Sequence, residues 1–74
     1  MITSTLLMSD SLAAAVYDDS QQTLQLTFRD GSRYLYSRVH PDLFQAMLAA
    51  RSKGRFFNQH IRRFFPYSKA APGL

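Results

Sequence analysis

The sequence predicts an α+β domain in which a three-stranded antiparallel meander is covered on one face by a main helix and a short second helix. Three observations support this fold class. Residues 23–28 alternate strictly between apolar and polar side chains, which is the pattern of a half-buried strand. Asp30 and Gly31 follow as a hairpin turn, and apolar residues after Pro41 recur at helical spacing.

The first strand is predicted over Leu12–Tyr17, an apolar run that ends at a cluster of polar, turn-forming residues. The three alanines at 13–15 could also begin a helix. The second strand covers Thr23–Phe28, and the third returns over Ser32–Val39 after the Asp30–Gly31 turn. These three strands make the predicted meander.

The length of the loop between the second and third strands decides which side chains share a face, because side chains alternate along a strand. A two-residue turn would bring Arg33 and Leu35 onto the apolar face of the second strand. A three-residue loop with Gly31 left-handed pairs Phe28 with Ser32 and places Tyr34 and Tyr36 there instead. The second arrangement separates apolar from polar side chains better, so we expect it.

Pro41 suits the first position of a helix, and we predict this helix over residues 41–52 with Gly54 as a left-handed stop. Its buried face is a stripe formed by Leu43, Phe44, Met47 and Leu48. A short second helix is predicted up to Pro66. Its apolar residues recur at intervals near four and are Phe56, Phe57, Ile61, Phe64 and Phe65. Such a basic amphipathic segment could also dock on a membrane or in a partner's groove, but a small domain needs these aromatic side chains in its core.

The chain has 74 residues, of which 46% are hydrophobic, and its ring-bearing core candidates are six Phe and four Tyr. This length suffices for one small domain. We assign residues 12–67 to it and expect residues 1–11 to be a partly ordered segment and residues 68–74 to be a flexible tail. The chain has no cysteine, which excludes disulfides and thiolate metal sites. With no apolar run of about 20 residues and no secretory signal, we expect a cytoplasmic protein that does not enter a membrane.

The charge is divided unevenly between the two halves of the chain. Residues 1–37 carry two arginines and four aspartates, a sum of −2, whereas residues 38–74 carry seven lysines and arginines and one aspartate, a sum of +6; together they give the net charge of +4. A basic half attracts nucleic acid, acidic proteins or anionic lipid. The alternative is a solvated basic face that only keeps the domain soluble.

Several short motifs recur in the order and spacing of a known family. They are Val16-Tyr17-Asp18, the Leu-x-Leu-x-Phe of residues 24–28, Gly31, the Tyr-x-Tyr of residues 34–36, and the run Ala50-x-Ser52-x-Gly54-x-Phe56-Phe57-Asn58-x-x-Ile61-Arg62. Over residues 12–67 the chain resembles the KTSC domain, a small family named for its occurrence at the C-terminus of some lysyl-tRNA synthetases and also found as stand-alone bacterial proteins. Ala15 and His40 depart from its usual pattern. The resemblance implies an α+β domain with a suspected role in RNA binding.

The basic segment from Arg51 to Arg63 supplies the nucleic-acid-binding candidates, which are Arg51, Lys53, Arg55, Asn58, Arg62 and Arg63. Guanidinium groups bind phosphate oxygens in pairs, and Asn58 offers both a donor and an acceptor. In the structural alternative, Asn58 caps the second helix and the arginines are merely exposed. Tyr34 and Tyr36 are candidates for stacking on bases, although the predicted hairpin favours their rings in the core.

We predict a non-catalytic binding domain whose leading partner is structured, tRNA-like RNA. His40 and His60 could in principle act as an acid and base pair on RNA, but nothing in the sequence brings them together, and two histidines without clustered carboxylates make no metal site. No glycine motif indicates a nucleotide cofactor, so we expect no cofactor. The alternative function is a protein interaction module that engages an acidic partner through the same basic surface. No feature of the sequence specifies an oligomeric state.

Overall fold

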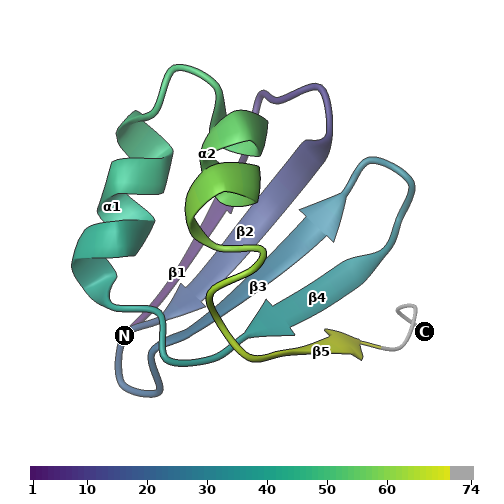
Figure 1. The fold of residues 1–74 in the computed structure, drawn as a ribbon. Helices are drawn as coiled ribbons and strands as arrows, with labels where there is room; N and C mark the ends of the chain where they lie inside the picture. The colour runs from purple at the N-terminus through teal and green to yellow at the C-terminus, as the bar shows by residue number, and fades with distance from the viewer. Residues whose placement is uncertain (71–74) are drawn as a thin grey trace.

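The computed structural model describes residues 1–70 and contains one antiparallel sheet with two helices on one of its faces (Figure 1). The strands are β1 (Ile2–Leu6), β2 (Leu12–Asp18), β3 (Thr23–Phe28), β4 (Arg33–Tyr36) and β5 (Tyr67–Ala70), and the helices are α1 (Pro41–Ala49) and α2 (Lys53–His60). The strand order is β1-β2-β3-β4-β5. The predicted α+β class with two helices over an antiparallel meander is confirmed, but the prediction of three strands is wrong because the sheet has five.

The two strands that the sequence analysis did not predict lie at the edges of the sheet. Residues 2–6, expected to be only partly ordered, pair with β2 from Ile2↔Asp18 to Leu6↔Ala14. Residues 67–70, of which residues 68–70 were expected to begin a flexible tail, pair with β4 from Tyr36↔Tyr67 to Arg33↔Ala70. Edge strands bury little side-chain surface, so neither carries the apolar alternation that identifies a central strand. Residues 71–74 of the predicted tail lie outside the described residues.

The β3–β4 hairpin has the predicted three-residue loop. The amide of Phe28 donates to the carbonyl of Ser32 at 2.8 Å, and the amide of Gly31 donates to the carbonyl of Phe28 at 3.0 Å. Gly31 has a positive φ of 90°, as a left-handed bulge residue requires. Tyr34 consequently pairs with Leu26, and Tyr36 with Leu24, on the helix-covered face of the sheet.

The helices begin and end at other residues than predicted. The helix predicted over residues 41–52 ends at Ala49, and Gly54 is the second residue of α2 rather than a stop with positive φ. The α2 helix begins earlier than predicted because the hydroxyl of Ser52 accepts the amide of Arg55 at 3.3 Å and caps its N-terminus. A Cβ at Gly54 would lie 2.7 Å from Oγ of Ser11, so glycine permits α2 to approach the β1–β2 loop closely.

The core lies between the sheet and the helices. Its fully buried members are Leu7, Leu12, Ala15, Tyr17, Leu24, Leu26, Tyr36, Val39, Phe44, Met47, Phe57 and Ile61. The Tyr17 hydroxyl donates to the carbonyl of Val39 at 2.6 Å, and its ring stacks on Phe44 with centroids 4.6 Å apart. Among the five apolar residues of the predicted amphipathic segment, only Phe64 is mostly exposed, at 67%. The other four are buried or partly buried in the core. Within residues 1–70 no helix is long and apolar enough to cross a membrane.

Candidate nucleic-acid interface

A cavity of about 500 Å³ opens on the helix-covered face where β3, β4 and β5 meet the end of α2. Its lining residues are Ser11, Phe28, Asp30, Ser32, Tyr34, Tyr36, Phe57, Asn58, Arg62, Arg63 and Tyr67. We call it the aromatic cavity. It brings together five of the eight residues that the sequence analysis selected: the two tyrosines of β4, Asn58 and the last two arginines of the basic segment.

Three tyrosines form one wall of the aromatic cavity. The ring centroid of Tyr67 lies 5.7 Å from that of Tyr34 and 5.5 Å from that of Tyr36. Their exposure differs: Tyr36 is 3% exposed, Tyr34 is half-buried and Tyr67 is 58% exposed. Tyr36 therefore has no open ring face on which a base could stack, and Tyr67 presents the most accessible ring. The Lys69 ammonium lies 5.9 Å from the ring centroid of Tyr34 and covers one of its faces.

Burial of Tyr36 also changes its acidity. Burial, and after it the nearby Tyr67, raises the pKa of Tyr36 above its ordinary value, whereas the positive charge of Arg62 acts in the opposite direction. The hydroxyl is therefore neutral at physiological pH and can donate a hydrogen bond as well as accept one. Tyr36 contributes a polar group to the cavity rather than a stacking surface.

Asn58, Arg62 and Arg63 form the opposite, polar wall. Asn58 lies within α2 and does not cap it, because Ser52 occupies the N-cap position; the capping alternative for Asn58 is wrong. The turn after α2 is held by the amide of Arg62, which donates to the carbonyl of Phe57 at 3.0 Å, and by burial of Ile61. This anchoring leaves both arginine side chains exposed at the cavity.

The remaining three candidates line a second cavity, of about 610 Å³, between the β1–β2 loop and the start of α2. Arg51 and Arg55 are exposed there, but the ammonium of Lys53 donates to the carbonyl of Ala50 at 3.2 Å and is half-buried. Ser11 and Asn58 line both cavities. The two hollows are therefore neighbours along one side of α2, and we refer to the two together as the basic cleft.

The arginines of the basic cleft are not neutralised by the aspartates of the first half of the chain. Within residues 1–70 the ion pairs join the Met1 ammonium to Asp19 at 2.8 Å and His40 to Asp42 at 3.7 Å, and no lysine or arginine takes part in one. One aspartate lines each cavity, Asp30 the aromatic cavity and Asp10 the second. Since two arginines line the first cavity and three basic residues the second, positive charge prevails in both.

The structure gives the two histidines separate positions. His40 caps α1, and its Nδ1 accepts the amide of Asp42 at 3.2 Å. His60 is the last residue of α2 and its ring lies 4.5 Å from that of Phe56. Neither lines a cavity described above, and residues 1–70 contain no cluster of three metal-ligating side chains.

Sequence reasoning missed Tyr67 and Ser11. Tyr67 begins a segment of only four residues after Pro66. Such a segment is a weak strand signal, and the sequence analysis placed it at the domain boundary and in the tail. Ser11 was assigned to the partly ordered N-terminal segment, and no local pattern connects it to α2. Ser11 lies in the β1–β2 loop, and the fold brings this loop close to Gly54 of α2.

Comparisons with known proteins agree with this fold. The family model described as the KTSC domain matches residues 8–65. A protein of Tsukamurella paurometabola is 44% identical over 57 residues, which are 77% of this chain and 85% of the relative. An uncharacterized protein of Stutzerimonas stutzeri is 47% identical over 53 residues, which are 72% of this chain and 75% of the relative. The crystal structure of a KTSC domain protein from Yersinia pestis superimposes with a TM-score of 0.90 at 28% identity and covers 96% of this chain and 100% of that chain. The chain belongs to the KTSC domain family.

Proposed function

We propose that this protein is a non-catalytic RNA-binding domain that binds structured, tRNA-like RNA and holds an unpaired segment of it in the basic cleft. The observation that carries the proposal is the aromatic cavity itself, which is lined both by the accessible Tyr67 and by Arg62 and Arg63, two arginines without an ion pair within residues 1–70. Proteins recognise single-stranded RNA by stacking aromatic side chains on splayed bases while basic side chains hold the phosphates. This cavity offers both kinds of group.

The tyrosine wall binds the bases of the RNA, and the arginines bind its phosphates. Tyr67, with Tyr34 beside it, supplies the stacking surface, and Asn58 and the Tyr36 hydroxyl, which line the same cavity, supply hydrogen bonds to a base edge. Arg62 and Arg63 bind phosphate oxygens. Arg51 and Arg55 extend the phosphate contacts along α2 into the second cavity. Lys53 adds charge but not a direct contact, since its ammonium already binds the Ala50 carbonyl.

The decisive experiment is a salt-titrated binding assay with labelled tRNA, with heparin as a generic polyanion. Replacing Arg62 and Arg63 with alanine removes two phosphate contacts, so the plot of log affinity against log salt should become shallower by roughly 1 to 2. Arg33→Ala is the single-charge control, because Arg33 pairs with Thr27 on the helix-free side of β4. It should change the affinity and the slope far less than Arg62→Ala alone.

A second pair of variants tests stacking independently of charge. Tyr67→Leu should weaken binding by roughly 1 kcal/mol or more, about fivefold or greater. Phe64→Leu is its control, because Phe64 is also mostly exposed, at 67%, but does not line the cavity. Equal affinity for tRNA and heparin, with no effect of Tyr67→Leu, would favour an acidic protein partner on the same surface instead.

A further inference from the structure

The edge strand β1 presents free backbone groups along its outer side. Antiparallel pairing directs alternate residues toward the neighbouring strand. The amide of Leu7 donates to the carbonyl of Ala13 at 2.9 Å, and the carbonyl of Met1 accepts the amide of Asp19 at 3.2 Å. Odd-numbered residues therefore bond to β2. Ile2, Ser4 and Leu6 direct their N–H and C=O groups to the free edge, where no further strand lies within residues 1–70.

This edge lacks the features that usually protect one. Natural edge strands carry lysine, proline or a bulge on the exposed side, or are very short. The opposite edge, β5, has four residues, follows Pro66 and contains Lys69. In contrast, β1 has five residues and no charged side chain. Four of the six exposed large hydrophobic residues lie on it or beside it, namely Met1, Ile2, Leu6 and Met8, with exposures from 64% to 92%.

The sequence of β1, Ile-Thr-Ser-Thr-Leu, is a palindrome of side-chain types centred on Ser4. We propose that β1 pairs with β1 of a second copy of this chain, antiparallel and with Ser4 on the two-fold axis. Ser4 then faces Ser4 of the other copy, Thr3 faces Thr5, and Ile2 faces Leu6. Each is a favourable cross-strand pair of like polarity. The residues whose backbone groups are free are also those that this register pairs by hydrogen bonds.

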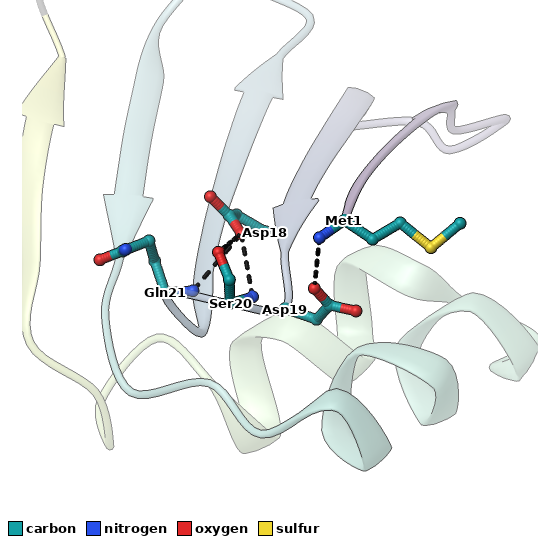
Figure 2. A network of polar contacts seen from close by, with 5 residues as sticks. All are labelled: Met1, Asp18, Asp19, Ser20 and Gln21. Carbon is teal, nitrogen blue, oxygen red and sulfur yellow. Dashed lines mark hydrogen bonds and ion pairs between the residues drawn. The ribbon is translucent and has the colours of Figure 1, made fainter.

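Aspartates outnumber cations at one end of β1, and an arginine lies at the other. Asp18 and Asp19 lie at the Ile2 end, where Asp19 holds the Met1 ammonium (Figure 2). At the other end, the guanidinium of Arg29 donates to the carbonyls of Leu7 and Ser9 at 3.3 and 3.0 Å. Antiparallel pairing brings the acidic end of each copy toward the basic end of the other. In this register Met1 faces Leu7 of the other copy, so the Met1 ammonium also lies near Arg29 of that copy and offsets part of this attraction.

The proposed dimer does not depend on RNA binding. It joins two sheets at their β1 edges and leaves β4, β5 and the aromatic cavity at the far edges of the combined sheet. A closed, two-fold contact between identical surfaces is the commonest arrangement of soluble homo-oligomers. The contact is short, so a weak, concentration-dependent dimer is expected.

The test is sedimentation of the full chain from micromolar to millimolar concentration without RNA. The mass should rise from 8.5 kDa toward twice that value. Ser4→Lys places two ammonium groups on the two-fold axis and should weaken association at least ~10-fold. Ser68→Lys, which adds the same charge to exposed β5, should leave association unchanged. A chain that stays monomeric throughout, or a dimer that Ser4→Lys leaves intact, would overturn the proposal.

Thiol cross-linking gives a second measurement that does not disturb the charge. The chain contains no cysteine, so Ser4→Cys introduces a single thiol at the proposed axis, where Cα atoms of directly opposed residues would lie roughly 5.5 Å apart. A short bismaleimide should link two copies of Ser4→Cys rapidly and two copies of Ser68→Cys only slowly. Equal rates for both variants would also refute pairing at β1.

Discussion

Tyr17 and Tyr36 occupy inward positions on β2 and β4, and each is 3% exposed. Their hydroxyl groups have different surroundings. The Tyr17 hydroxyl is tied to the Val39 carbonyl inside the core, whereas the Tyr36 side chain lines the aromatic cavity. Burial is the largest cause that raises the pKa of each. Alternation along a strand predicts that such rings point inward, but the partner of each hydroxyl depends on packing between distant elements.

Asp18 and Asp30 illustrate a local device that the chain uses twice. Oδ1 of Asp18 accepts the Ser20 hydroxyl at 2.7 Å and the Ser20 amide at 3.0 Å (Figure 2). Oδ1 of Asp30 accepts the Ser32 hydroxyl at 2.6 Å and the Ser32 amide at 2.9 Å. In each case the hydrogen bond from the serine side chain is the main reason that the pKa of the aspartate is below its ordinary value. Both aspartates thereby fix the turns that join neighbouring strands.

The Asp30–Ser32 pair makes a pH-dependent prediction. Ser32→Ala removes the hydroxyl that contributes most to the low pKa of Asp30, so this pKa should rise toward its ordinary value of 3.8. Because the depressed pKa favours the folded state only while Asp30 is ionised, the variant should be less stable than the wild type above this pH. The difference should vanish as the pH falls through the pKa of folded Asp30. NMR titration of the Asp30 carboxyl measures the shift directly.

Ser68→Ala is the control for this experiment, because Ser68 is exposed on β5 and no hydrogen bond joins its hydroxyl to a carboxylate within residues 1–70. It should leave the Asp30 titration unchanged. An Asp30 pKa that is the same in Ser32→Ala and in the wild type would show that the serine hydroxyl does not lower it.

At the scale of elements, the β3–β4 hairpin depends on one backbone conformation. Gly31 has a φ of 90°, and a Cβ added to it would meet no atom within 4 Å. Gly31→Ala should therefore destabilise the fold through backbone strain alone, by about 1 kcal/mol, as measured by urea unfolding. Gly31→Asn should cost less, because asparagine adopts positive φ more readily than alanine. Equal stability of the alanine variant and the wild type would mean that the loop has an alternative conformation.

The same hairpin shows how far the sequence predicts this fold. β3 alternates over its whole length, and its partner strand follows a loop with glycine at a position that needs positive φ, so the register and the inward tyrosines follow from local rules. The edge strands were not predictable in this way. β1 has an exposed, largely polar pattern, and β5 has four residues. Their pairing is determined by neighbouring strands that are remote in sequence.

The α2 helix shows why the candidate site was predicted only in part. Its basic residues were evident from composition, but the helix begins at Lys53 because Ser52 caps it, and Gly54 contacts Ser11 instead of ending α1. This shift places Arg62 and Arg63 in a turn beyond the helix, facing β4 and β5. The pairing of these arginines with Tyr67 depends on a strand that the sequence did not reveal.

At the scale of the whole molecule, the opposed charges of the two chain halves are separated by the fold rather than neutralised. The acidic residues lie mainly in the turns of the sheet, where Asp18 and Asp30 bind serines and Asp19 binds the Met1 ammonium. The basic residues gather along α2 and the turn after it. Local hydrogen bonds occupy these three carboxylates, so they leave the arginines of the basic cleft available to an outside anion.

The N-terminal residues 1–7 contribute to the folded domain, although the family match begins at residue 8. Leu7 follows β1 directly and is 1% exposed within the core, whereas its neighbour Met8 is 92% exposed. Leu7→Ala should lower the free energy of unfolding by about 2 to 5 kcal/mol, because it removes buried methyl groups and leaves a cavity. For a domain of this size that is a large share of its stability, which is of order 0.05 to 0.15 kcal/mol per residue.

Met8→Ala is the matched control and should change the free energy of unfolding by less than about 0.5 kcal/mol. Both variants are compared by urea unfolding at low micromolar protein, where pairing between β1 strands makes no contribution. A large effect at Leu7 with none at Met8 means that residues 1–7 unfold together with the rest of the domain. If the two variants have equally small effects, the N-terminal strand opens independently, and the cooperative unit begins at β2.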